Sequence, residues 1–135
     1  MKTSLKNTNK YFKPKEVTLI KEFIQFLQKE LPLSTNINIS FDIERVGNMT
    51  TGVRLAKHNI HVLVKDRLLV DILRTLSHEW VHEFQHQKMG LKDNDKIQDI
   101  GGPEENMANI LSGIFLKKFA KEFPNLKETM FGEKD

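Results

Sequence analysis

Apolar residues recur along the chain with two different periods, and these periods predict the elements of the fold. Between residues 15 and 31 they return every three to four positions, which predicts an amphipathic helix that ends before Pro32. From residue 37 to 44 they alternate strictly with polar residues, as in a half-buried strand. Two shorter strands are predicted at 53–56 and 59–64. We expect these three strands to form a small antiparallel sheet.

The second half of the chain has helical periodicity in two long segments. The first runs from about Asp66 to Met89. Its apolar stripe consists of Leu69, Ile72, Leu73, Leu76, Val81 and Phe84. The second begins at Pro103, a residue that suits the first helical position, and stops before Pro124. Its apolar residues are Met107, Ile110, Leu111, Ile114, Phe115 and Phe119. With a polar loop at 91–102 between them, these elements predict an α+β fold.

The length of 135 residues and the hydrophobic content of 39% fit one domain with one modest core. We expect a single domain over residues 1–135, with a flexible basic lead-in at 1–15 and a loose tail at 125–135. No apolar run approaches the roughly 20 residues of a membrane span, and no secretory signal is visible. The chain has no cysteine, which excludes disulfides, thiol nucleophiles and cysteine-ligated zinc. These features predict a cytoplasmic protein without a membrane partner.

The net charge of +3 comes mainly from lysines, which are spread over the whole length. Proteins that read nucleic acids more often cluster their positive charge and use arginine forks. The charge pattern therefore permits an acidic partner without requiring one, and it does not by itself indicate nucleic-acid binding.

The motif H-E-x-x-H lies within the predicted helix of residues 66–89, as His78, Glu79 and His82. Two histidines four residues apart project from one face of a helix and can bind one zinc ion. Glu79 is offset around the helix, so its carboxylate can lie beside the metal and take a proton from a water molecule. The motif therefore predicts a catalytic zinc site with one ion per chain.

A catalytic zinc site needs a third protein ligand, and the last predicted helix offers Glu104 and Glu105. We select Glu105 because Ala108 and Asn109 lie three and four residues after it, on the same face. A small residue there allows close approach of the two helices. A polar residue there can accept the second ring N–H of a ligand histidine. Glu104 instead suits the first turn of a helix, where an acid complements the helix dipole.

The pattern His78-Glu79-x-x-His82, followed on a later helix by Glu105-x-x-Ala108-Asn109, resembles the gluzincin class of metallopeptidases. The short chain is similar to the single-domain minigluzincins and to small proteins of tailed bacteriophages assigned as metallopeptidases. The resemblance covers about residues 53–120. It implies a minimal zincin-like fold in a zinc-dependent endopeptidase, with a small sheet, an active-site helix and a glutamate helix, and it suggests a phage protein in a host cytoplasm.

Two features depart from the larger gluzincins. These usually carry an acid where Asn109 stands, and a downstream tyrosine or histidine that stabilises the oxyanion. Here Tyr11 is the only tyrosine and no histidine follows His86. The candidates for the oxyanion role are His58, His61 and Arg54. The alternative is that zinc alone stabilises this charge.

The leading hypothesis is a zinc metallopeptidase in which His78, His82 and Glu105 hold the ion and Glu79 is the general base. Its partner would be a peptide or protein, paired with the edge of the strand at 59–64. One alternative is a DNA-associated protease of the Spartan type, suggested by the basic charge. The other is a non-enzymatic, metal-stabilised binding or regulatory module. Glu79, which a purely structural site does not need, favours catalysis.

Overall fold

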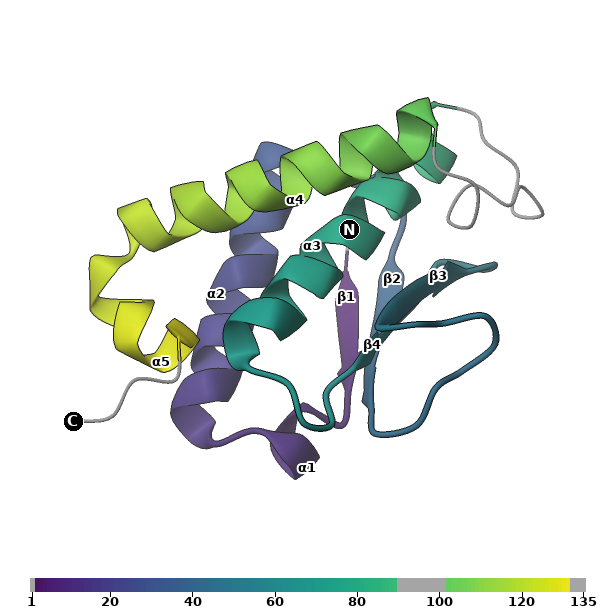
Figure 1. The fold of residues 1–135 in the computed structure, drawn as a ribbon. Coiled ribbons are helices and arrows are strands. Elements are labelled where there is room, and N and C mark those ends of the chain that lie inside the picture. The colour runs from purple at the N-terminus through teal and green to yellow at the C-terminus, as the bar shows by residue number, and fades with distance from the viewer. Residues whose placement is uncertain (1, 90–101, 132–135) are drawn as a thin grey trace.

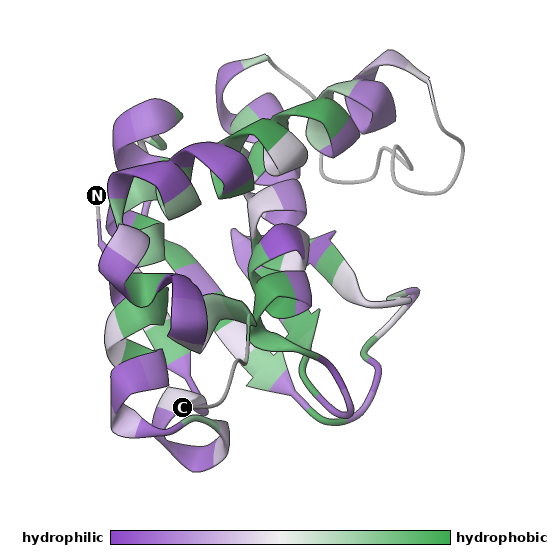
Figure 2. Cartoon of the chain, turned by 60° about the vertical axis from the view of Figure 1, so that its left-hand side comes forward, coloured by the Kyte–Doolittle hydropathy of each residue, from purple (hydrophilic) through white to green (hydrophobic). Residues whose placement is uncertain are grey.

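The computed structural model describes residues 2–89 and 102–131 and shows a mixed fold of helices and one small sheet (Figure 1). The long helices gather on one face of the sheet, and their apolar residues form one core with the strand residues that face them. Figure 2 shows hydrophobic residues concentrated between the helices and the sheet. No described helix meets the length and apolarity that a membrane crossing requires.

The sheet has four strands in the order β1-β2-β4-β3. They are β1 (Thr3–Lys6), β2 (Ile37–Asp42), β3 (Gly52–Leu55) and β4 (Asn59–Leu63). Only the hairpin of β3 and β4 is antiparallel, while β2 pairs in parallel with both β1 and β4. The predicted three-stranded antiparallel sheet is therefore wrong. The chain crosses over after β2, so β4, and not β3, becomes the neighbour of β2.

The three predicted long helices are present within a few residues of their expected ends. They are α2 (Pro14–Glu30), α3 (Leu69–Lys88) and α4 (Pro103–Glu122). Helix α2 begins where expected for a local reason, because the Lys13 amide donates a hydrogen bond of 2.8 Å to Oε1 of Glu16. The predicted polar loop falls almost entirely on residues 90–101, which lie outside the described residues.

Both ends of the chain carry more structure than predicted. The segment expected to be a flexible lead-in contains β1 and the short helix α1 (Thr8–Tyr11), because β1 pairs with β2. The ring of Phe12 also packs edge-on against Phe41, with 5.3 Å between centroids. The segment expected to be a loose tail forms a 3-10 helix, η1 (Pro124–Leu126), and α5 (Lys127–Phe131), and Met130 is fully buried in the core.

Helix α4 buries a narrower face than its apolar sequence predicts. Phe115 and Phe119 are buried as expected, but Ile110 and Ile114 are 62% and 51% exposed. The helix packs against α3, and its small residue Ala108 is fully buried. Close approach brings the first turn of α4 to the C-terminal half of α3, and this contact positions the site described next.

Candidate metal centre

Two helices supply three side chains that meet at one point. His78 and His82 project from one face of α3, and Glu105 comes from the first turn of α4. Oε1 of Glu105 lies 2.9 Å from Nε2 of His82, and Oε2 lies 3.2 Å from Nε2 of His78. The two ring nitrogens are 3.2 Å apart. One ligand atom from each residue lies within 4.8 Å of the others, so the group could hold a metal ion.

A residue that the sequence analysis missed, Gln85, holds the ring of His82 in place. Nε2 of Gln85 donates a hydrogen bond of 2.9 Å to the backbone carbonyl of Glu104, which can only accept. The amide oxygen of Gln85 therefore faces His82, 2.9 Å from Nδ1. Since an amide oxygen is also only an acceptor, Nδ1 must carry a proton. In the neutral ring, Nε2 then presents its lone pair to the ligand cluster, as metal binding requires.

Burial of His78 favours the neutral ring that binds metals. The side chain of His82 is fully buried and that of His78 is 18% exposed. Burial lowers the pKa of His78 below its usual value, and the charge of Glu105 partly opposes this effect by raising it. His78 is therefore neutral to a lower pH than a free histidine. A ring without a proton on its ligating nitrogen is the form that a cation binds.

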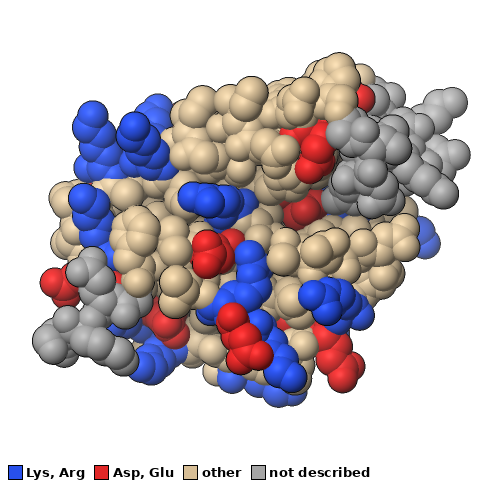
Figure 3. Space-filling view, in the orientation of Figure 1, with Lys and Arg blue, Asp and Glu red and all other residues tan. Residues whose placement is uncertain are grey.

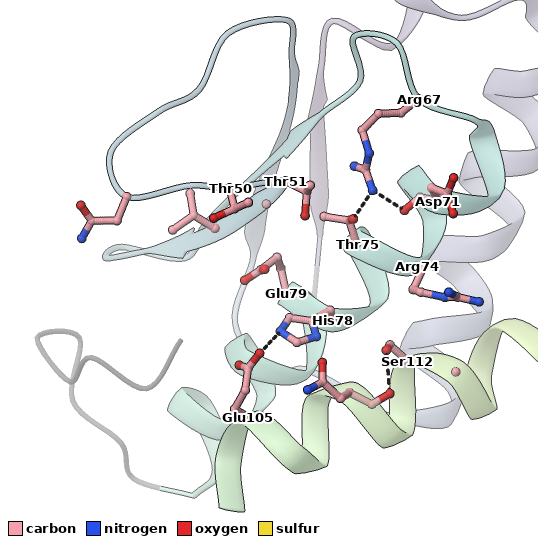
Figure 4. A pocket seen from close by; sticks show the side chains of 15 residues that line it. Thr50, Thr51, Arg67, Asp71, Arg74, Thr75, His78, Glu79, Glu105 and Ser112 are labelled. Atoms are coloured by element: carbon pink, nitrogen blue, oxygen red, sulfur yellow. Dashed lines mark hydrogen bonds and ion pairs between the residues drawn. The ribbon is translucent and has the colours of Figure 1, made fainter. Parts of the chain in front are cut away.

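Glu79 lies beside the ligand cluster and against the neighbouring strand. Its side chain is buried and approaches the backbone of Gly52 in β3 (Figure 4). A Cβ atom at position 52 would lie 3.2 Å from Cγ of Glu79 and only 2.4 Å from Cγ2 of Thr75. A glycine is thus needed at this position, because α3 and β3 come too close for any side chain.

The cluster opens into a cleft of about 530 Å³. Helix α3, helix α4 and the chain entering β3 form its walls, and Figure 3 shows the hollow below α4. Arg67 stiffens the wall far from the ligands, where its guanidinium donates to Thr75 Oγ1 at 2.8 Å and to the carbonyl of Leu63 at 2.9 Å. The lining extends from Glu105 to Arg67 and Arg74, so the cleft has room for more than a metal ion.

The three oxyanion candidates do not line this cleft. Arg54 donates from Nε to Oε1 of the fully buried Glu83 at 2.6 Å, and Nδ1 of His58 contacts Oε2 of the same carboxylate at 2.6 Å. His61 lies on the opposite face of the sheet, with Nδ1 2.8 Å from Oδ2 of Asp42. The contacts of these three candidates therefore lie with Glu83 and Asp42 rather than in the cleft, and the alternative of zinc alone stays open.

Asn109 also has a place different from its predicted one. It is an exposed residue in the lining of the cleft, while Gln85 accepts the second ring N–H of a ligand histidine, the role that we expected of Asn109. Glu104 contributes its backbone carbonyl to Gln85. Gln85 could have been noticed in the sequence as a polar residue three positions after His82, close to the apolar stripe of α3.

The donor set consists of two imidazole nitrogens and one carboxylate, which suits zinc and other divalent ions. Among residues 2–89 and 102–131, no second group of three histidine or acidic side chains is placed to hold a metal. Comparison of this chain with protein-family models, with curated proteins and with solved structures found no match.

Proposed function

We propose that this protein is a zinc-dependent metallopeptidase. The observation that carries the proposal is the position of the Glu79 carboxylate, beside the cluster of His78, His82 and Glu105 and at the wall of an open cleft. Structural zinc sites are usually closed by four protein ligands. A group of three ligands at a cleft, with an acid next to it, is instead the arrangement that hydrolysis requires.

The residues of the chain divide the chemistry between them. A zinc ion held by the cluster would supply Lewis acidity, which polarises a carbonyl group and lowers the pKa of a water molecule. Glu79 accepts a proton from the attacking water on a carboxylate oxygen and delivers it to the nitrogen of the leaving amine. Glu105 and Gln85 keep the two histidine rings turned toward the reacting centre.

The strand available to an extended substrate is β3, and not the strand that we expected. The predicted segment 59–64 is β4, which pairs with β2 on one side and β3 on the other. Its backbone groups are therefore already bonded. Strand β3 lies at the edge of the sheet, and Gly52 and Val53 line the cleft. An extended peptide can add to such an edge through main-chain hydrogen bonds.

The two alternative functions remain without a specific observation in their favour. A DNA-associated protease would need a surface that recognises DNA beside the cleft. A purely regulatory module would not need a buried acid in contact with the strand at the ligand cluster. Peptide hydrolysis uses the three ligand groups and Glu79 together.

The experiment that tests this proposal compares zinc-loaded parent protein with Glu79→Gln on denatured casein. The parent should hydrolyse casein, and Glu79→Gln should lose at least about a hundredfold in rate, because an amide cannot accept the proton. Glu44→Gln, an exposed residue after β2, serves as the matched control and should keep the parent rate. If Glu79→Gln and the parent cleave casein equally well, Glu79 has no part in catalysis.

A further inference from the structure

A second hollow of about 510 Å³ lies next to the cleft, between α3, α4 and α5, and we call it the basic groove. Its apolar lining is formed by Val70, Leu116, Ala120 and Phe131. Its charged lining is formed by Arg74, Lys117, Lys121 and Lys127. Figure 1 shows the three helices around it, and Figure 3 shows Lys and Arg side chains gathered over the same part of the surface. The groove thus combines an apolar surface with a positive rim.

Among the described residues, no acidic side chain pairs with the cations of the rim. The described part of the chain contributes no acidic residue to the lining of the basic groove. Within residues 2–89 and 102–131, none of its four cations forms an ion pair. The neighbouring Lys118 differs, because its Nζ lies 2.9 Å from Oε1 of Glu30. Four like charges around one hollow attract an anionic ligand more strongly than the dispersed lysines elsewhere.

The basic groove is continuous with the cleft of the metal centre. Arg74 and Gly113 belong to the lining of both hollows. A Cβ atom on Gly113 would meet nothing within 4 Å, so packing does not explain a glycine inside α4, where it weakens the helix. The bare backbone at this junction leaves room for a chain that passes from one hollow into the other.

We propose that the basic groove binds an acidic and apolar segment of the substrate polypeptide, on one side of the bond that is cleaved. This inference rests on the proposed peptidase function, which identifies the chain in the cleft as a substrate. Carboxylates of the segment would pair with Lys117, Lys121 and Arg74, and its apolar side chains would pack on Leu116 and Ala120. Because the cations are exposed, the attraction is screened by salt.

Binding is tested without catalysis, on zinc-loaded Glu79→Gln protein. The probes are two fluorescein-labelled ten-residue peptides, one of alternating glutamate and leucine and one with lysine in place of glutamate. By fluorescence anisotropy, the acidic peptide should bind at least tenfold more tightly than the basic one, and 0.5 M salt should reduce this preference. Adding Lys117→Glu and Lys121→Glu to the Glu79→Gln protein should lower its affinity for the acidic peptide at least tenfold.

The matched control reverses two lysines outside the groove, Lys6→Glu and Lys57→Glu, and should change binding less than twofold. Equal affinity of the Lys117→Glu/Lys121→Glu variant and its control for the acidic peptide would overturn the proposal. Light scattering provides a second decisive result. If the parent is a dimer that the Lys117→Glu/Lys121→Glu change dissociates, the groove holds a second copy of the chain and the proposal is wrong.

A cleavage assay separates this proposal from the proposed function. The active parent is given a peptide library, and products are sequenced by mass spectrometry. Enrichment of Asp and Glu on one side of the cleaved bond, lost in Lys117→Glu/Lys121→Glu, supports the proposal. Cleavage without such enrichment overturns the groove proposal alone. Binding of the acidic peptide without any cleavage overturns the peptidase proposal and leaves an anionic-peptide site.

Discussion

The imidazole of His82 and the amide of Gln85 form a hydrogen bond of 2.9 Å, and the same amide bonds the backbone carbonyl of Glu104. One side chain thereby sets the tautomer of a candidate ligand and connects α3 with the first turn of α4. Since Glu105 follows directly in that turn, Gln85 holds both helices at the separation that brings the three ligand groups together. We regard Gln85 as a positioning residue of the metal centre.

Replacing Gln85 should weaken metal binding although it contributes no ligand. Gln85→Leu removes the acceptor for Nδ1 of His82, so we expect zinc affinity to fall about 10–100-fold, as for other partners of ligand histidines. Asn109→Ala is the comparison and should leave the affinity within about threefold, because Asn109 lies in the cleft lining instead. Competition with a chromogenic chelator measures both. Equal losses in the two variants would contradict the role assigned to Gln85.

The two neighbouring acids of α4 should differ sharply in metal binding. Glu105→Ala removes one of three ligand groups and should lower zinc affinity by orders of magnitude. Glu104→Ala keeps the backbone carbonyl that Gln85 uses and should change affinity little. Zinc titration with mass spectrometry of the intact protein decides between them. Release of zinc by Glu104→Ala and its retention by Glu105→Ala would reverse the assignment.

A methyl group at position 52 should disturb catalysis more than metal binding. In Gly52→Ala the new Cβ would lie 2.4 Å from Cγ2 of Thr75 and 3.2 Å from Cγ of Glu79. Either strand β3 or these two side chains must therefore shift. We expect about one zinc per chain and a loss of casein hydrolysis of roughly tenfold or more, as small displacements of reacting groups produce. Adding Thr75→Ser removes the closest contact while keeping the hydroxyl bound by Arg67, and should restore part of the activity.

The ion pair below the β3-β4 hairpin should matter for folding. Glu83 is fully buried, and Arg54, His58 and Gln87 each contact its carboxylate at 2.6 Å. Glu83→Ala removes the buried carboxylate that the guanidinium of Arg54 contacts, so we expect the free energy of unfolding to fall by about 3–5 kcal/mol. The double variant Arg54→Met/Glu83→Met should lose less, because no unpaired charge remains. Urea denaturation measures both, and a loss below about 1 kcal/mol in Glu83→Ala would contradict this account.

Features of the fold that depend on neighbouring residues could be predicted from the amino-acid sequence. Helix hydrogen bonds connect residues four apart, so local periodicity predicted α2, α3 and α4, and Pro103 marked the start of α4. The same local geometry places His78 and His82 on one face of α3. Even the preference for Glu105 over Glu104 came from helix periodicity, and the structure puts Glu105 beside the two rings.

Features that join residues distant along the chain became visible only in the folded structure. Strand β1 pairs with β2, 34 residues later, and no local pattern in a short polar segment encodes that partner. Gln85 meets the backbone of Glu104, and Gly52 meets Thr75, only after α3 has packed on α4 and on the sheet. The basic groove likewise exists only where three helices converge. Such contacts depend on how whole helices and strands pack. Each helix or strand is stabilised mainly by the surface that it buries against the rest of the fold, so its own short segment of sequence does not encode these contacts.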